Sequence, residues 1–242
     1  MDDEYDDIVK NGDSSFKKEK YMDAIREYTK AYAMADGEAK AEICYKLSQA
    51  YFSLEPKNTD NPIKYANEAL DIHKKLEEQD MAVMDIINLG YIFLNSGKRD
   101  EAIKYFDQAI SISKEIKDVQ LIALTNNAKA EALSTLKSKH NDALAIYNDV
   151  INITEKSHDW ENYFEAVYGE INILRTRDIN EAFELGKKNL DLIDTIIAGI
   201  KTKKDKKEFR DSLAYMYDVT SDMAMELENI DEAMKIAARL AN

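Results

Sequence analysis

The stretch MDIINLGYIFLNSGKRDEAIKYFDQAISI, residues 84–112, decides the fold of this chain. It reads as two amphipathic helices joined by a turn at Gly97, because apolar side chains recur at helical spacing on both sides of that glycine. Small residues would let the two helices approach closely, and larger apolar side chains would fill the space between them. The small residues are Gly90, Ala102 and Ala109, and the larger ones are Leu89, Phe93, Phe106 and Ile110. The stretch therefore predicts a helical hairpin whose helices nearly touch at Gly90.

Related stretches recur along the whole chain. Each contains a small residue followed directly by a larger apolar one, and the small residues are Ala24, Pro62, Ala102, Ala143, Ala182 and Ala233, in steps of 38, 40, 41, 39 and 51 residues. A period of about 20–50 residues is typical of stacked units that cannot bury their apolar face alone. The longer last step predicts a long helix from about Asn180 to Lys203, followed by another from about Asp205 to Glu228.

The composition agrees with a helical protein. The chain has 242 residues, of which only 7 are Gly and 2 are Pro, and a sheet protein of this length needs more residues of the tight-turn type. A net charge of −14 argues against a general nucleic-acid binder and favours a basic or neutral partner. No apolar run is long enough to span a bilayer, no signal peptide is recognisable, and the single cysteine, Cys44, reads as a buried thiol in a reducing compartment. We expect a soluble, cytoplasmic protein.

The stretch at 84–112 resembles the tetratricopeptide repeat (TPR), which has Leu-Gly, an aromatic residue three positions on, a glycine turn, and then Ala, an aromatic residue and Ala. The steps are nearer to 40 residues than to the common 34, as in the TPR domains of bacterial peptide sensors and kinesin light chains. The resemblance implies an all-α, right-handed superhelix of about twelve helices in six antiparallel pairs. It implies a single repeat domain over residues 1–242, with units at about 4–36, 37–77, 79–116, 118–156, 158–203 and 205–242.

In TPR proteins the first helix of each pair lines a concave groove, and the resemblance places candidate ligand-binding residues there. They are Tyr45, Lys46, Gln49, Met84, Ile87, Asn88, Tyr91, Asn95, Asn127, Phe164 and Tyr168. An asparagine amide can pair with a peptide backbone whatever the peptide's side chains are, and aromatic neighbours supply apolar contact area. The resemblance to peptide sensors assigns that role to Asn88 and Asn127. The alternative is that either asparagine bonds only to its neighbouring helix.

No catalytic motif is recognisable. The histidines His73, His140 and His158 lack metal-ligand spacing and fall near helix ends, where we expect them to be solvated. No glycine-rich phosphate loop or nucleophile elbow occurs, so the sequence predicts no enzyme, no cofactor and no metal. The basic segment Lys201–Arg210 is open to two interpretations, which are an exposed helix junction and a docking site for an anionic partner.

The function predicted from these features is a module that binds a protein or peptide segment in the groove. The alternative is a self-assembling structural subunit, because the last helix is apolar along one side and no later helix follows to cover it. The residues of that side are Ile230, Ala233, Met234, Ala237 and Leu240, and a homodimer through the C-terminal helices would bury them. A third interpretation, an enzyme or enzyme regulator with an unrecognised site, has no motif to support it.

Overall fold

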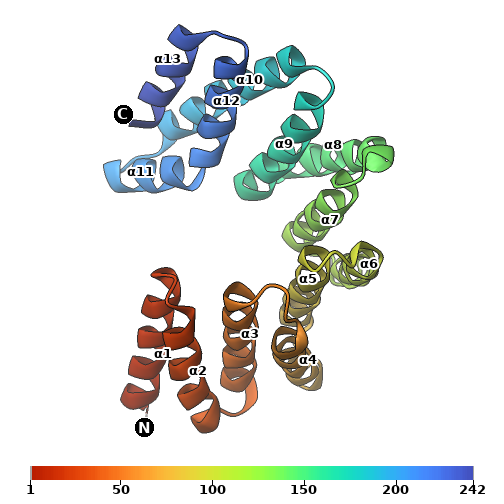
Figure 1. The fold of residues 1–242 in the computed structure, drawn as a ribbon, viewed down its shortest axis with the longest axis vertical. Coiled ribbons are helices and arrows are strands. Elements are labelled where there is room, and N and C mark those ends of the chain that lie inside the picture. Colours follow the sequence, from red (N-terminus) through yellow and green to blue (C-terminus); the bar gives the residue numbers. More distant parts are fainter. Residues whose placement is uncertain (1, 242) are drawn as a thin grey trace. The chain divides into compact units, whose positions relative to one another are not determined.

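The computed structural model describes residues 2–241, and these residues form 13 α-helices, one 3₁₀ helix and no strand (Figure 1). In chain order the helices are α1 (Asp2–Lys17), α2 (Tyr21–Met34), α3 (Gly37–Leu54), α4 (Asp60–Lys75), α5 (Gln79–Asn95), α6 (Arg99–Ile116), α7 (Val119–Ser134), η1 (Lys137–Lys139), α8 (His140–Ser157), α9 (Trp160–Arg175), α10 (Ile179–Gly199), α11 (Lys203–Ser212), α12 (Ala214–Glu226) and α13 (Ile230–Ala241). The all-α fold class predicted from the sequence is confirmed.

The chain divides into two compact units, Met1–Ala132 and Leu133–Asn242. We call them the N-terminal unit and the C-terminal unit. The first contains α1 to α6 and most of α7, and the second contains α8 to α13. A single repeat domain over residues 1–242 stays a prediction.

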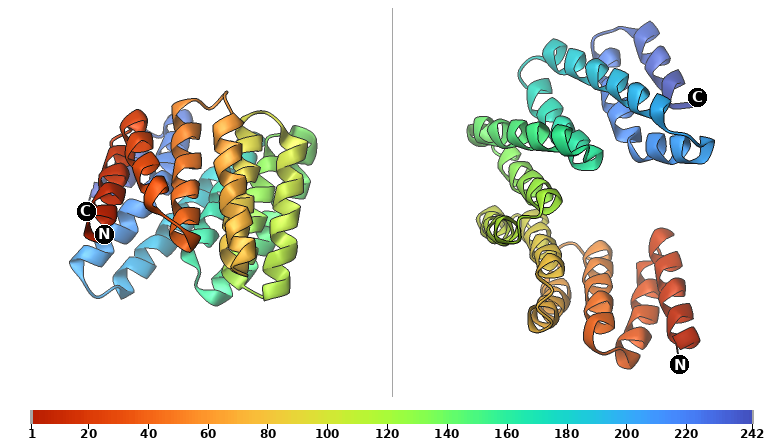
Figure 2. Two further views of the ribbon diagram at one scale, coloured as in Figure 1. Left: turned by 90° about the horizontal axis from the view of Figure 1, so that it is seen from below. Right: turned by 180° about the vertical axis from the view of Figure 1, so that it is seen from behind.

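The N-terminal unit is a row of helical hairpins in which each helix from α1 to α6 packs against the next along the chain (Figure 2). Its central core forms where α5 and α6 meet, and Leu89, Ala102 and Phe106 have no exposed surface there. A Cβ atom added to Gly90 would lie 2.4 Å from Phe106 Cε1, closer than real Cβ contacts allow. The same relation holds in the first hairpin, where a Cβ on Gly12 would lie 2.5 Å from Tyr28 Cε1. Glycine is therefore required by close approach at both positions.

The turn predicted at Gly97 is present. Gly97 follows α5 with a φ of 78°, in the left-handed region that glycine adopts at low cost. Gly37 opens α3 with a φ of 51°, and the short helix η1 leads into His140. Helix α4 begins at Asp60, so Pro62 lies in its first turn, where the missing N–H costs no helical hydrogen bond.

The C-terminal unit departs from the expected helix count. The long helix predicted from about Asn180 is α10, with 21 residues. The helix expected from Asp205 to Glu228 is instead two helices, α11 and α12, which are separated at Leu213. Leu213 is buried and has a φ of −107° and a ψ of 16°, so the helical hydrogen bonding is interrupted there. None of the residues of α11 is buried, whereas α12 places Met216 and Tyr217 in the core. Helix α11 is polar and lies on the surface, whereas α12 contributes apolar side chains to the core, so the two segments do not continue as one straight helix.

Candidate functional site

Helices α3 and α5 both pack against α4, and a hydrogen bond between their side chains joins them directly. Seven of the predicted residues on α3 and α5 keep exposed or half-buried side chains. They are Tyr45, Lys46, Gln49, Met84, Asn88, Tyr91 and Asn95, and we call this surface the α3–α5 face. Met84, Asn88, Tyr91 and Asn95 follow one another at steps of three or four residues, so they form one stripe along α5.

Asn88 connects the two helices of this face. Its side-chain nitrogen Nδ2 donates a hydrogen bond to Ser48 Oγ at 3.1 Å. Ser48 is fully buried and donates in turn to the carbonyl oxygen of Pro62 at 2.9 Å. Asn88 therefore does bond to its neighbouring helix, as the alternative interpretation proposed. The same bond fixes the orientation of the amide, and no other hydrogen bond within the described residues engages its carbonyl oxygen Oδ1.

Aromatic side chains flank Asn88 on both helices. Tyr91 donates its hydroxyl to Glu131 Oε2 at 2.8 Å, and its ring meets Phe106 edge-on at a centroid distance of 5.3 Å. Tyr45 accepts a hydrogen bond from Gln49 Nε2 at 2.9 Å. Burial raises the pKa of the Tyr45 phenol, with a smaller contribution from Asp85, so the hydroxyl stays neutral. Both rings are held in place with part of their surface exposed.

Charges of both signs surround the face. Lys46 Nζ lies 2.9 Å from Asp13 Oδ1 and 3.5 Å from Glu42 Oε1. Asp13 also accepts a hydrogen bond from Tyr28 at 2.8 Å, and this contact, together with burial, raises the pKa of the Tyr28 phenol. The lysine is thus already matched by carboxylates of α1 and α3, and it adds no net positive charge to this part of the surface.

The remaining predicted residues do not join the α3–α5 face. Ile87 and Asn127 are 6% and 5% exposed, too little for a groove contact. Phe164 lies in the C-terminal unit and is fully buried in its core. Tyr168 belongs to the same unit, where it is exposed and meets Tyr215 edge-on at 5.1 Å. The prediction for Phe164 fails for a physical reason, since the stretch Tyr163–Phe164 turns both rings into the core.

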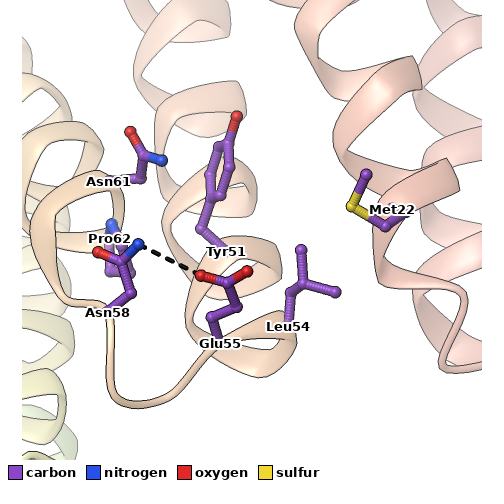
Figure 3. Close-up of a pocket in the computed structure, with 7 residues that line it drawn as sticks. All are labelled: Met22, Tyr51, Leu54, Glu55, Asn58, Asn61 and Pro62. Atoms are coloured by element: carbon purple, nitrogen blue, oxygen red, sulfur yellow. Dashed lines mark hydrogen bonds between the residues drawn. The ribbon is translucent and has the colours of Figure 1, made fainter.

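A small cavity lies at the far end of α3. It has a volume of about 210 Å³ and is lined by Met22, Tyr51, Leu54, Glu55, Asn58, Asn61 and Pro62. Figure 3 shows these side chains around the α3–α4 loop, where Asn58 Nδ2 donates to Glu55 Oε2 at 3.2 Å. Small-molecule sites usually have about 300–1,000 Å³, so this cavity is of the size of one side chain.

Two histidines contradict the expectation that they are solvated. His73 is 1% exposed and His140 is 7% exposed, whereas His158 is exposed as expected. His73 Nδ1 lies 2.6 Å from Asp85 Oδ2, and Asp85 is also 1% exposed. Burial raises the pKa of the Asp85 carboxyl to about 6, against the opposing effect of His73. The one sequence signal for this pair was an aspartate inside the apolar run MAVMDIINLG.

Among the described residues we also looked for metal-binding groups, a reactive thiol and membrane-spanning helices. No group of three or more His, Cys, Asp and Glu side chains is arranged there to hold a metal ion. Cys44 is fully buried, as the sequence predicted, and burial raises the pKa of its thiol to about 12. Between residues 2 and 241, none of the helices has the length and apolar character needed to cross a membrane.

Comparison with known proteins agrees with the hairpin geometry. A tetratricopeptide repeat model matches residues 86–116, and no curated protein sequence matches the chain. Three solved structures share the fold. A Rap protein complexed with competence and sporulation factor is 20% identical, with a TM-score of 0.65 over 99% of this chain and 74% of that chain. Aspartyl phosphate phosphatase F from Bacillus subtilis is 21% identical, with a TM-score of 0.70 over 98% of this chain and 69% of that chain. The Rap conjugation gene regulator of the plasmid pLS20, in complex with the Phr* peptide, is 18% identical, with a TM-score of 0.62 over 97% of this chain and 73% of that chain.

Proposed function

We propose that this tetratricopeptide-repeat protein binds an extended peptide segment across the α3–α5 face of its N-terminal unit and catalyses no reaction on it. The TPR fold is generally an interaction module. Two proteins that share the fold are described in complex with a competence and sporulation factor and with a peptide. Those ligands belong to those proteins, and they support the class of ligand proposed for this chain.

The observation that carries the proposal is the fixed amide of Asn88. Because Nδ2 is bonded to Ser48 Oγ, the carbonyl oxygen Oδ1 is held in one orientation and can accept a backbone N–H of a ligand. An extended peptide has backbone N–H groups at every second residue on one side. A fixed acceptor loses little conformational entropy on binding, which favours affinity.

The neighbours of Asn88 supply the apolar part of the contact. Met84 and Tyr91 lie one turn on either side of it along α5, and Tyr45 lies on α3. Aromatic and methionine side chains are enriched at protein interfaces because they bury much area with few rotatable bonds or adapt to irregular surfaces. The net charge of −14 favours a ligand that is basic or neutral overall. We extend the proposal to a cytoplasmic location, where the reduced thiol of Cys44 is stable.

The experiment is a selection from a library of random peptides of about ten residues, with the full chain immobilised. Selection on the wild type, with depletion on Asn88→Ala, enriches peptides that need the Asn88 carbonyl. Enrichment of peptides whose binding to the wild type is saturable supports the proposal. If no peptide of the library is retained better by the wild type than by the Asn88→Ala variant, the proposal is contradicted.

A second candidate function, self-assembly, rests on the exposed apolar residues of the last two helices. Met225, Ile230 and Met234 are 53%, 57% and 68% exposed. Ala233 and Leu240, which the sequence placed on the same side, pack instead against the core of the C-terminal unit. The exposed surface is therefore smaller than the sequence suggested, which makes peptide binding the better-supported function.

A further inference from the structure

His73 and Asp85 form a buried pair, with His73 Nδ1 2.6 Å from Asp85 Oδ2. An ionised carboxylate is an acceptor only. In the tautomer that this pairing favours, Nδ1 carries the proton and Nε2 presents a lone pair. His73 and Glu78 both line the adjoining cavity, whereas Asp85 does not.

A second acceptor faces that lone pair. Glu78 Oε2 lies 3.9 Å from His73 Nε2, and both atoms are buried. Neither has a hydrogen-bond partner among the described residues. Two buried acceptors that face each other are costly, because each has lost its contact with water and gained no donor. A donor with several N–H groups placed between them would satisfy both.

The cavity at this point has a volume of about 550 Å³, and we call it the His73 cavity. It is lined by His73, Lys74, Glu77, Glu78, Gln79, Ala82, Ile112 and Glu115, from the α4–α5 turn and the C-terminal part of α6. Three carboxylates against one lysine give it a net negative charge. Glu77 is in the left-handed region with a φ of 62°, which forms the turn between the two helices. Ala82 and Ile112 add an apolar wall.

We propose that the His73 cavity binds a primary ammonium group carried on an aliphatic chain. The ammonium has three N–H donors, enough for His73 Nε2, Glu78 and a further carboxylate such as Glu115. Its methylene groups would lie along Ala82 and Ile112. A metal ion fits less well, because no three ligating side chains come together in the described residues and the cavity far exceeds the volume of one ion. The chemistry is shared by a lysine side chain of another protein and by a free alkyl diamine.

The test follows the three histidine side chains by ¹⁵N-edited NMR on the full chain, each assigned from its single substitution to Gln. The probes are 1,5-diaminopentane for a free amine and Nα-acetyl-lysine methylamide for a protein side chain. The Nε-acetylated form of the second probe keeps the same methylene chain and has no charge. We expect a saturable shift of the His73 Nε2 resonance with at least one amine and none with the acetylated probe. The amine that saturates at the lower concentration identifies the source.

Variants keep the proposal falsifiable. Glu78→Gln should weaken amine binding about ten- to hundredfold, since a charge-assisted hydrogen bond is replaced by a neutral one. Glu101→Gln removes an exposed carboxylate of α6 outside the cavity and should leave the affinity unchanged. Asn88→Ala should also leave it unchanged, which separates this site from the α3–α5 face. A His73 resonance that ignores both amines, or equal binding by wild type and Glu78→Gln, would overturn the proposal.

Discussion

Phe106 occupies the space that any side chain on Gly90 would need. A Cβ on Gly90 would lie within 2.4–2.8 Å of three atoms of the Phe106 ring, and Phe106 has no exposed surface into which it could move. This contact fixes the spacing of α5 and α6, and α5 carries Asn88 two residues before Gly90. The close packing of the hairpin and the orientation of the proposed binding residues thus depend on each other.

The first prediction concerns that contact. Gly90→Ala should lower the free energy of unfolding by about 1–3 kcal/mol through overpacking. Gly199→Ala is the control, because nothing lies within 4 Å of its added Cβ and its backbone is not in the left-handed region. Urea denaturation followed by circular dichroism measures both. A Gly90→Ala variant that is more stable than the wild type, as the helix propensity of alanine alone would make it, would show that the two helices are not in close contact.

The second prediction concerns Cys44. A thiol that is fully buried with a pKa of about 12 has almost no thiolate at neutral pH, and the thiolate is the reactive form. The folded chain should therefore react with Ellman's reagent only as fast as it unfolds, and one thiol should react at once in guanidinium chloride. Rapid reaction of the native protein would mean that Cys44 is accessible.

The third prediction concerns Asp85, which faces His73 of α4 and interacts electrostatically with Tyr45 of α3. Its folded pKa of about 6 lies above the ordinary 3.8, so the folded chain binds a proton more tightly than the unfolded chain. The resulting stabilisation is complete below about pH 3.8 and is lost as the pH rises through 6. The stability of the wild type relative to Asp85→Asn should thus fall between pH 4 and pH 7, by up to about 3 kcal/mol. A difference that is constant or rises with pH would contradict this assignment.

The fourth prediction tests self-assembly. If the exposed residues of α12 and α13 join two copies, Met234→Glu should convert a dimer into a monomer in sedimentation velocity. Met22→Glu is a matched control, since Met22 is 65% exposed and Met234 is 68% exposed. A wild type that sediments as a monomer at all concentrations would remove this candidate function.

The sequence predicted the repeat because the repeat is local. The spacing of Gly90, Ala102 and Phe106 depends only on helical periodicity and on one turn, so the hairpin could be assigned without knowledge of the rest of the chain. The resemblance to TPR proteins placed Asn88 in the groove, and Asn88 is half-buried on α5, where Leu89 and Gly90 pack toward α6. The break at Leu213 could not be predicted in this way, since it depends on which segment reaches the core of the C-terminal unit.

The burial of the other predicted residues also depended on tertiary contacts. In the fifth repeat the small residue is Gly169, whose added Cβ would lie 2.2 Å from Tyr147 of α8. The burial of His73 depends on Asp85, twelve residues away. The apolar run around Asp85 indicates a buried carboxylate, but it does not identify His73 as the partner.

The central claim is that the Asn88 carbonyl binds a peptide backbone on the α3–α5 face. The direct measurement is the Kd of a peptide selected on the wild type, by fluorescence anisotropy, for the wild type, Asn88→Ala and Asn67→Ala. Asn67 is an exposed asparagine of α4, the second helix of its pair, and serves as the control. We predict a ten- to hundredfold higher Kd for Asn88→Ala and an unchanged Kd for Asn67→Ala, because the loss of one buried hydrogen bond costs about 1–3 kcal/mol. Wild-type affinity in a folded Asn88→Ala variant would contradict the account.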